Sequence, residues 1–105
     1  MEQRQKFTGI DPGSVRHVTC IGAGPIGAGW CAWFLARGYQ VTAYLHVIAE
    51  EASLRAVIDS AWSSLESLGL APGAARANLK CTTDLAEAVA KAQFVQECAP
   101  ENLAL

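Results

Sequence analysis

Six consecutive residues near the start of the chain have the types and spacing that hold a diphosphate. Residues 22–27 follow an apolar run, open an apolar helical pattern and read G-x-G-x-x-G. In such a unit the first glycine permits a tight turn, the second lets the main chain approach a diphosphate, and the third lets helix and strand pack closely. The helix start adds N–H donors and a positive dipole end. We favour this role over glycines that serve packing alone, and predict dinucleotide contacts from Gly22, Ala23, Gly24, Pro25, Ile26 and Gly27.

The hydrophobic pattern predicts alternating strands and helices around this turn. Short apolar runs predict strands at 15–21, 39–45, 79–83 and 94–98, and three- and four-residue apolar spacings predict helices at 26–37, 49–68 and 84–91. Gly38 and Gly69 end the first two helices, and Asp84 caps the third. This order requires right-handed crossovers, so we predict an α/β fold, the N-terminal part of a Rossmann-type parallel sheet with helices on both faces. Residues 1–14 are expected to form a flexible lead-in and 15–105 a single, truncated dinucleotide-binding domain.

The same spacings predict which side chains the helices bury. On the helix at 26–37, large apolar residues alternate with glycine and alanine, which indicates tight packing. The inward positions of the other two helices are expected at Leu54, Val57, Ile58, Ala61, Leu65 and Leu68, and at Leu85, Ala88 and Val89.

The end of the second predicted strand lacks the acid that this kind of site normally has. A carboxylate there usually accepts hydrogen bonds from the adenosine ribose of NAD, but Leu45 occupies the position and no arginine close by favours the 2′-phosphate of NADP. Losing those bonds costs about 1–3 kcal/mol, or roughly tenfold to hundredfold in affinity. Glu50 and Glu51 are alternatives, although we expect them to complement the dipole of the following helix instead.

Length and composition exclude several classes of protein. The 105 residues are 51% hydrophobic with a net charge of -2, which is enough apolar surface for one core but too short a chain for a separate substrate domain. The basic residues are scattered, so we expect no nucleic-acid partner. The uncharged stretch 18–36 is interrupted by glycines and Pro25, and the N-terminus lacks an apolar signal segment, so we expect neither a membrane span nor secretion.

The four cysteines do not predict a metal site. Cys20, Cys31, Cys81 and Cys98 form no C-x-x-C pair, and only two histidines accompany them. Free, mostly buried thiols are typical of a reducing compartment, so we expect a cytoplasmic protein without bound metal.

Several blocks of the sequence resemble one family of dehydrogenases. Residues 18–30 (VTCIGAGPIGAGW), 34–43 (FLARGYQVTA) and 94–103 (FVQECAPENL), with 61–62 and 65–73, are similar to the N-terminal NAD-binding domain of the 3-hydroxyacyl-CoA dehydrogenase family, especially its carnitine 3-dehydrogenase-like branch. The resemblance runs from about residue 15 to the last residue. It implies NAD as the cofactor and an oxidoreductase that passes hydride between NAD and the 3-hydroxyl carbon of an acyl-CoA or of carnitine.

The resemblance also implies which functional residues the chain contains. The family's catalytic histidine and its partners lie further along than residue 105, so we predict no catalytic residue here and no turnover by this chain alone. His17 and His46 are expected to be surface or capping side chains. Glu101 matches the family's acid on the nicotinamide side, although a solvated terminal acid explains it equally well. Leu45 replaces the family's aspartate, and Cys98 stands where relatives often have serine.

Other readings of the chain remain open from sequence alone. A non-catalytic Rossmann-like sensor or interaction module that has lost tight dinucleotide binding would keep the same core. Flavin oxidoreductases and methyltransferases use related glycine turns, but the first also need the missing acid and the second prefer closer glycines. The small-molecule 3-hydroxy substrate belongs to a full-length enzyme. An exposed fourth strand would promote self-association, which leaves a homo-oligomer open.

Overall fold

A computed structural model describes residues 12–22 and 24–97. In chain order the elements are η1 (Pro12–Ser14), β1 (His17–Ile21), α2 (Pro25–Ala36), β2 (Gln40–Tyr44), α3 (Glu50–Leu68), η2 (Arg76–Asn78), β3 (Leu79–Thr82), α4 (Leu85–Val89) and β4 (Phe94–Glu97). The predicted strands and helices are therefore all present, and most of their ends shift by one or two residues. The short η2 turn was not predicted. Most of the expected lead-in lies outside the described residues.

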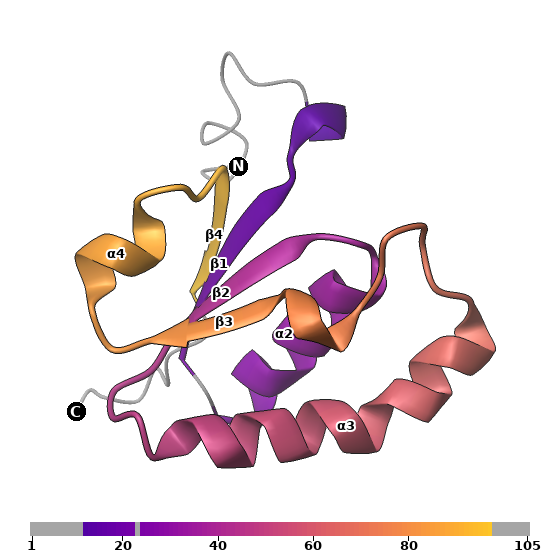
Figure 1. The fold of residues 1–105 in the computed structure, drawn as a ribbon, viewed down its shortest axis with the longest axis horizontal. Helices are drawn as coiled ribbons and strands as arrows, with labels where there is room; N and C mark the ends of the chain where they lie inside the picture. The colour runs from indigo at the N-terminus through magenta and orange to yellow at the C-terminus, as the bar shows by residue number, and fades with distance from the viewer. Residues whose placement is uncertain (1–11, 23, 98–105) are drawn as a thin grey trace.

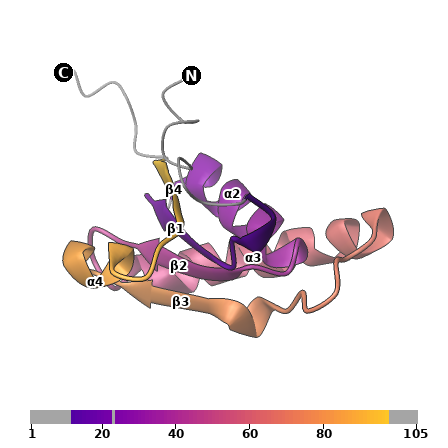
Figure 2. The same ribbon diagram turned by 90° about the horizontal axis from the view of Figure 1, so that it is seen from above.

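The four strands form one parallel sheet in the order β3-β2-β1-β4 (Figure 1). In the register, His17 pairs with Gln40 and Val18 with Phe94. Helices α2 and α3 lie on one side of the sheet and α4 on the other (Figures 1 and 2). This arrangement confirms the predicted Rossmann-type sheet with helices on both faces. Because all strands run the same way, their carboxyl ends meet at a single edge, where the turn before α2 begins.

The core lies between the sheet and the α2–α3 layer. It contains Val18, Cys20, Ala28, Cys31, Leu35, Val41, Ala43, Leu45, Leu54, Ile58 and Trp62 among others, each at most 6% exposed. Helix α2 presents mainly small residues to the strands, which lets its backbone approach them closely. Its large residues face outward instead: Ile26 is 68%, Trp33 46% and Trp30 38% exposed. The expectation that these residues pack tightly was wrong, because the alanines, Cys31 and Leu35 fill the buried face.

Two further expectations about buried side chains were wrong. On α3 the buried side chains, Leu54, Ile58 and Trp62, recur every four residues, whereas Val57 and Leu68 are 44% and 79% exposed. Val57 lies one residue off this row, about 100° around the helix. On α4, Leu85 and Val89 are 48% and 38% exposed and only Ala88 is buried. There the Thr19 hydroxyl of β1 donates a hydrogen bond to the Ala88 carbonyl.

The connection from α2 to β2 is a tight turn closed by a distant loop. Gly38 has a φ of 90°, in the region that favours glycine. A Cβ at this position would lie 2.6 Å from the carbonyl oxygen of Pro72. The Ala71 amide donates to the Ala36 carbonyl at 2.9 Å, which holds that loop in place. Gly38 thus ends α2, as predicted, and also permits a long-range contact that the sequence did not indicate.

Candidate functional site

The predicted glycine turn lies at the carboxyl edge of the sheet, between β1 and α2. Gly22 has a φ of 112°, which bends the chain away from the strand. Its amide donates to the Tyr44 carbonyl at 3.2 Å, so the turn is held against the end of β2. Gly24 is the extended N-cap residue of α2, and the Ala28 amide donates to its carbonyl at 2.8 Å. Pro25 is the first helical residue, where its missing N–H costs nothing.

The glycines of this turn have different roles. A Cβ built on Gly24 meets no atom within 4 Å, so the packing of the described residues does not require glycine there. Gly27, in contrast, is buried on α2, where a small residue allows close packing. No side chain caps the start of α2, which is what an anion-binding helix start requires. The main chain at Gly24 therefore has room beside it for a diphosphate, whereas close packing is sufficient to explain the glycine at position 27.

The structure brings most of the predicted cofactor-binding residues together. Gly22 directly follows β1, Gly24 is the N-cap of α2, and Pro25, Ile26 and Gly27 form the first turn of that helix. Ile26 is largely exposed beside the turn, and with Pro25, Gly29, Trp30 and Trp33 it lines an open apolar hollow of about 380 Å³. Ala23 and Glu101 lie outside the described residues, as does Cys98.

The end of β2 contains no carboxylate where the ribose acid was expected. Leu45 is completely buried, and its amide continues the strand pairing by donating to the Thr82 carbonyl at 2.9 Å. One carboxylate oxygen of Glu50 accepts from the amides of His46 and Val47, at 3.0 and 3.4 Å. The acid thus closes the loop between β2 and α3, a more specific role than the dipole complementarity we expected.

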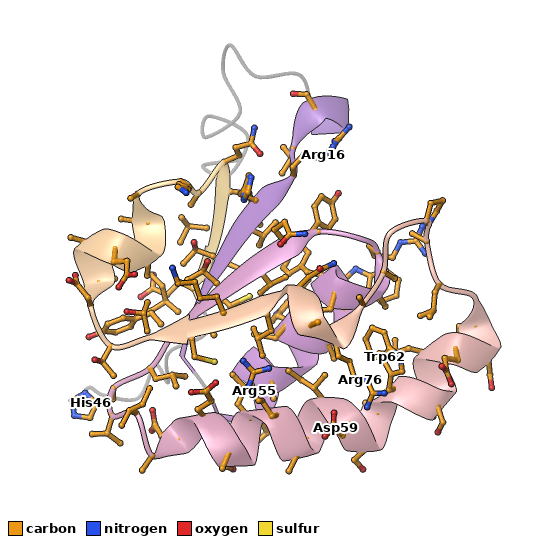
Figure 3. The ribbon with its side chains drawn as sticks, in the orientation of Figure 1. Arg16, His46, Arg55, Asp59, Trp62 and Arg76 are labelled. Carbon is orange, nitrogen blue, oxygen red and sulfur yellow. The ribbon has the colours of Figure 1, made fainter. Side chains whose placement is uncertain are left out.

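The carboxylate of Glu51 is also engaged, in an ion pair within α3. Its carboxylate pairs with the guanidinium of Arg55 one turn along α3, at 2.8 Å. Arg55 in turn donates to the Leu79 carbonyl at 3.2 Å and so joins α3 to the start of β3. In Figure 3, Arg55 lies on α3 beneath the sheet, whereas His46 projects outward from the loop.

Both histidines of the chain, His17 and His46, are exposed, as expected.

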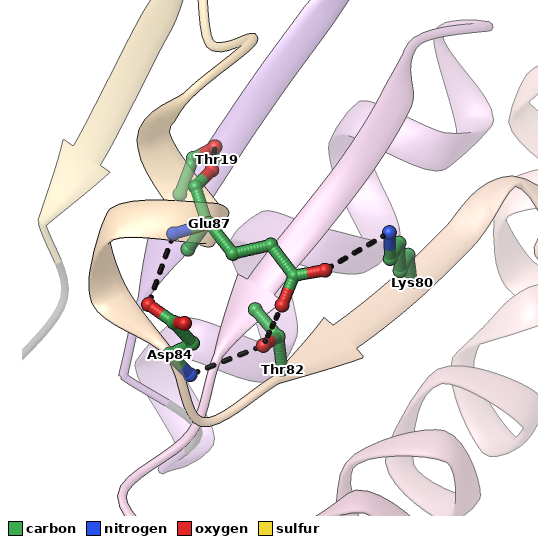
Figure 4. A network of polar contacts seen from close by, with 6 residues as sticks. Thr19, Lys80, Thr82, Asp84 and Glu87 are labelled. Carbon is green, nitrogen blue, oxygen red and sulfur yellow. Dashed lines mark hydrogen bonds and ion pairs between the residues drawn. The ribbon is translucent and has the colours of Figure 1, made fainter.

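A polar cluster holds α4 at the end of β3 (Figure 4). The Glu87 amide donates to the Asp84 carboxylate at 3.1 Å, which confirms the predicted cap. The Thr82 hydroxyl donates to the Glu87 carboxylate at 2.8 Å and accepts from the Asp84 amide at 3.1 Å. Lys80 lies 3.3 Å from the other carboxylate oxygen. The hydrogen bond from Thr82, followed by the interaction with Lys80, lowers the pKa of Glu87.

The structure describes three of the four cysteines. Cys20 and Cys31 are buried and Cys81 is half-buried. Burial, reinforced by the charge of Glu51, raises the pKa of Cys81 to about 11. Within residues 12–22 and 24–97, no group of three or more histidine, cysteine or acidic side chains is placed to hold a metal ion. None of the helices in this part of the chain has both the length and the apolar character needed to cross a membrane.

The fold and the turn together define a class of protein. A parallel sheet whose first strand passes through an open glycine turn into a helix is the first part of a dinucleotide-binding Rossmann domain. The family model for the 3-hydroxyacyl-CoA dehydrogenase NAD-binding domain matches residues 17–105. The chain belongs to this family of NAD-binding domains.

Similar sequences have been described as L-carnitine dehydrogenases. The chain is 55% identical over 94 residues to the L-carnitine dehydrogenases of Nocardiopsis dassonvillei and Streptomyces griseus. These matches cover 90% of this chain but only 29% and 28% of the two relatives. The chain therefore corresponds to a minor part of each relative's length.

Solved structures of dehydrogenases share the fold. One is the NAD+-dependent dismutase 5-formyl-3-hydroxy-2-methylpyridine 4-carboxylic acid 5-dehydrogenase, with a TM-score of 0.72 and 34% identity over 86% of this chain and 29% of that one. Another is the (S)-3-hydroxybutyryl-CoA dehydrogenase of Ralstonia eutropha, with a TM-score of 0.72 and 25% identity over 87% of this chain and 33% of that one.

Proposed function

We propose that the turn at residues 22–27 is where this chain binds NAD, and that it does so as part of a dehydrogenase acting on a 3-hydroxy substrate. The observation that carries the proposal is the open space at Gly24. A residue that packing leaves free to carry a side chain is nevertheless glycine, at a helix start that no side chain caps. Close approach of a diphosphate to the main chain accounts for both features.

The proposed reaction is hydride transfer between NAD and the 3-hydroxyl carbon of the substrate. Bound NAD would supply the hydride acceptor, and this chain's own contribution is to hold and orient the dinucleotide. The L-carnitine dehydrogenases at 55% identity favour a carnitine-like substrate over a 3-hydroxyacyl-CoA. We further propose that Glu101 contributes on the nicotinamide side, because it matches the family's acid after the fourth strand.

Catalysis is proposed to require more protein than these residues. The two histidines, His17 and His46, are exposed at the start of β1 and in the loop after β2. Neither position follows β4, where the family places its nicotinamide-side acid. We therefore propose that this chain alone binds the cofactor without turning over substrate.

Calorimetric titration of the chain with NAD+ tests the cofactor site, and the chain offers a matched pair of variants. Gly24→Ala adds a methyl group at the proposed diphosphate site, the N-cap of α2, and Gly29→Ala adds one further along α2. Neither new Cβ meets an atom within 4 Å. Both variants should fold. We expect Gly24→Ala to weaken binding about tenfold or more, whereas Gly29→Ala changes it less than about threefold. Equal affinities for wild type and Gly24→Ala would reject the site.

A further inference from the structure

The surface beside the glycine turn decides which dinucleotide the chain accepts. In this fold the adenosine ribose of the cofactor lies over the end of β2. A carboxylate there accepts hydrogen bonds from the ribose hydroxyls and repels the 2′-phosphate of NADP, whereas a nearby arginine attracts that phosphate. The hydrogen bond from the Gly22 amide to the Tyr44 carbonyl, at 3.2 Å, places the end of β2 directly beside the turn.

Three acids among the described residues near the end of β2 and β3 are held by contacts of their own. Glu50 accepts from the His46 and Val47 amides, and Glu51 pairs with Arg55. Asp84, which follows β3 at the same edge of the sheet, accepts from the start of α4. Each of these carboxylates is therefore engaged by a protein partner, and none of them is at position 45.

The position of the usual acid carries no charge, and the nearby Glu50 carboxylate is bound by the amides of the same loop. Leu45 is fully buried and has no polar side-chain atom, and the next three residues, His46, Val47 and Ile48, are exposed. Arg55, the cation of α3 nearest in sequence, is engaged by Glu51 and by the Leu79 carbonyl. Among the described residues at the end of β2, no acid therefore occupies the usual position at residue 45, and the guanidinium of Arg55 is already engaged.

We infer that this chain does not distinguish NAD from NADP, because the end of β2 offers an aliphatic and imidazole surface to the 2′ position of the ribose. The inference rests on the proposed binding of a dinucleotide at residues 22–27. It adds that the 2′-phosphate is tolerated there. Both cofactors should bind at similar strength, and both more weakly than NAD binds to a domain that has the acid.

Parallel titrations of the full 105-residue chain with NAD+ and NADP+ at equal ionic strength test the inference. We expect dissociation constants within about threefold of each other. His46→Arg adds a guanidinium on the exposed loop and should favour NADP+ over NAD+ by about fivefold or more. Val57→Arg adds the same charge at an exposed position on α3 and should leave the ratio unchanged.

A second variant restores the missing acid. Leu45→Asp should produce a preference for NAD+ of about tenfold or more. Because Leu45 is fully buried, this variant is first checked for folding by circular dichroism. If it fails to fold, the ratios for wild type and for His46→Arg still decide the question.

The possible results separate this inference from the proposed function. A wild-type preference of about tenfold or more for either cofactor would overturn the inference and leave the cofactor site standing. An unchanged ratio in His46→Arg would also overturn it, because the 2′-phosphate would then lie elsewhere. Absence of binding by both cofactors at millimolar concentration would reject the proposed function together with the inference.

Discussion

Replacing Gly38 with alanine should destabilise the fold through two separable effects. The first is conformational, because a φ of 90° is unfavourable for a residue with a Cβ and costs about 1–2 kcal/mol. The second is steric. The new Cβ would lie 2.6 Å from the Pro72 carbonyl oxygen, a backbone atom, and relieving such overpacking costs about 1–3 kcal/mol. The loop cannot move away freely, since the Ala71 amide is bonded to the Ala36 carbonyl at 2.9 Å.

Gly73 provides the matched control for this substitution. It has a φ of 85°, close to that of Gly38, but a Cβ there meets nothing within 4 Å. Gly73→Ala should therefore cost only the conformational part, about 1–2 kcal/mol, whereas Gly38→Ala should cost about 2–5 kcal/mol. That larger loss is a substantial fraction of the roughly 5–15 kcal/mol that stabilises a typical domain.

Urea unfolding followed by tryptophan fluorescence measures the difference. Trp62 is buried in the core and is exposed on unfolding, whereas Trp30 and Trp33 are already partly exposed. The two variants should differ in the free energy of unfolding by about 1–3 kcal/mol, with similar denaturant slopes. A difference below about 0.5 kcal/mol would refute the reasoning, because the Pro72 contact would then impose no steric cost.

Two further predictions concern ionisation. Thr82→Val removes the main cause of the lowered pKa of Glu87, so NMR titration should show that pKa rising toward its ordinary value of 4.5. Because the folded-state pKa of Glu87 is lowered, its contribution to stability is present above pH 4.5 and is lost as the pH falls through the folded-state pKa. Acid unfolding of Thr82→Val should show less of this loss of stability. An unchanged pKa of Glu87 in the variant would contradict the role of Thr82. At neutral pH, alkylation of Cys81 should be slow, because a pKa of about 11 in place of 9.0 leaves roughly a hundredfold less thiolate. Glu51→Gln should accelerate the alkylation, since Glu51 raises that pKa, and a faster reaction of wild type than of an unfolded control would contradict the burial argument.

The sequence was sufficient to predict the order of elements because local signals agreed with one another. The glycine turn followed an apolar run, Gly69 ended α3, and Asp84 capped α4 as its position before Glu87 indicated. The strand order and the crossovers then followed from the handedness of parallel β-α-β units. Each of these inferences depends on neighbours within a few residues, where sequence spacing is informative.

The errors arose where burial depends on distant partners. Spacing alone could not show that Trp62 rather than Val57 is buried, because both positions lie near the edge of the same apolar stripe. The outward direction of Trp30 and Trp33 depends on how closely the small residues bring α2 to the strands. The contact between Gly38 and Pro72 joins residues far apart in the chain, so no local pattern could indicate it.

The candidate site was predictable in part. Residue types and spacing were sufficient to place the glycine turn between the first strand and the following helix, and to show that Leu45 replaces the usual acid. They did not show that Glu50 is held by the His46 and Val47 amides, since a glutamate in a first helical turn usually serves the helix dipole. Such loop contacts depend on backbone geometry that the spacing of residues does not determine.

The most direct test of the cofactor site is an NMR titration of the isotopically labelled chain with NAD+. The account predicts that the amides of Gly22, Gly24, Ile26 and Gly27 shift most and saturate together. The groove on the other face of the sheet, lined by His17, Lys80 and Lys91 among others, should remain unchanged. Largest shifts in that groove, with the turn unaffected, would contradict the assignment of the dinucleotide to the start of α2.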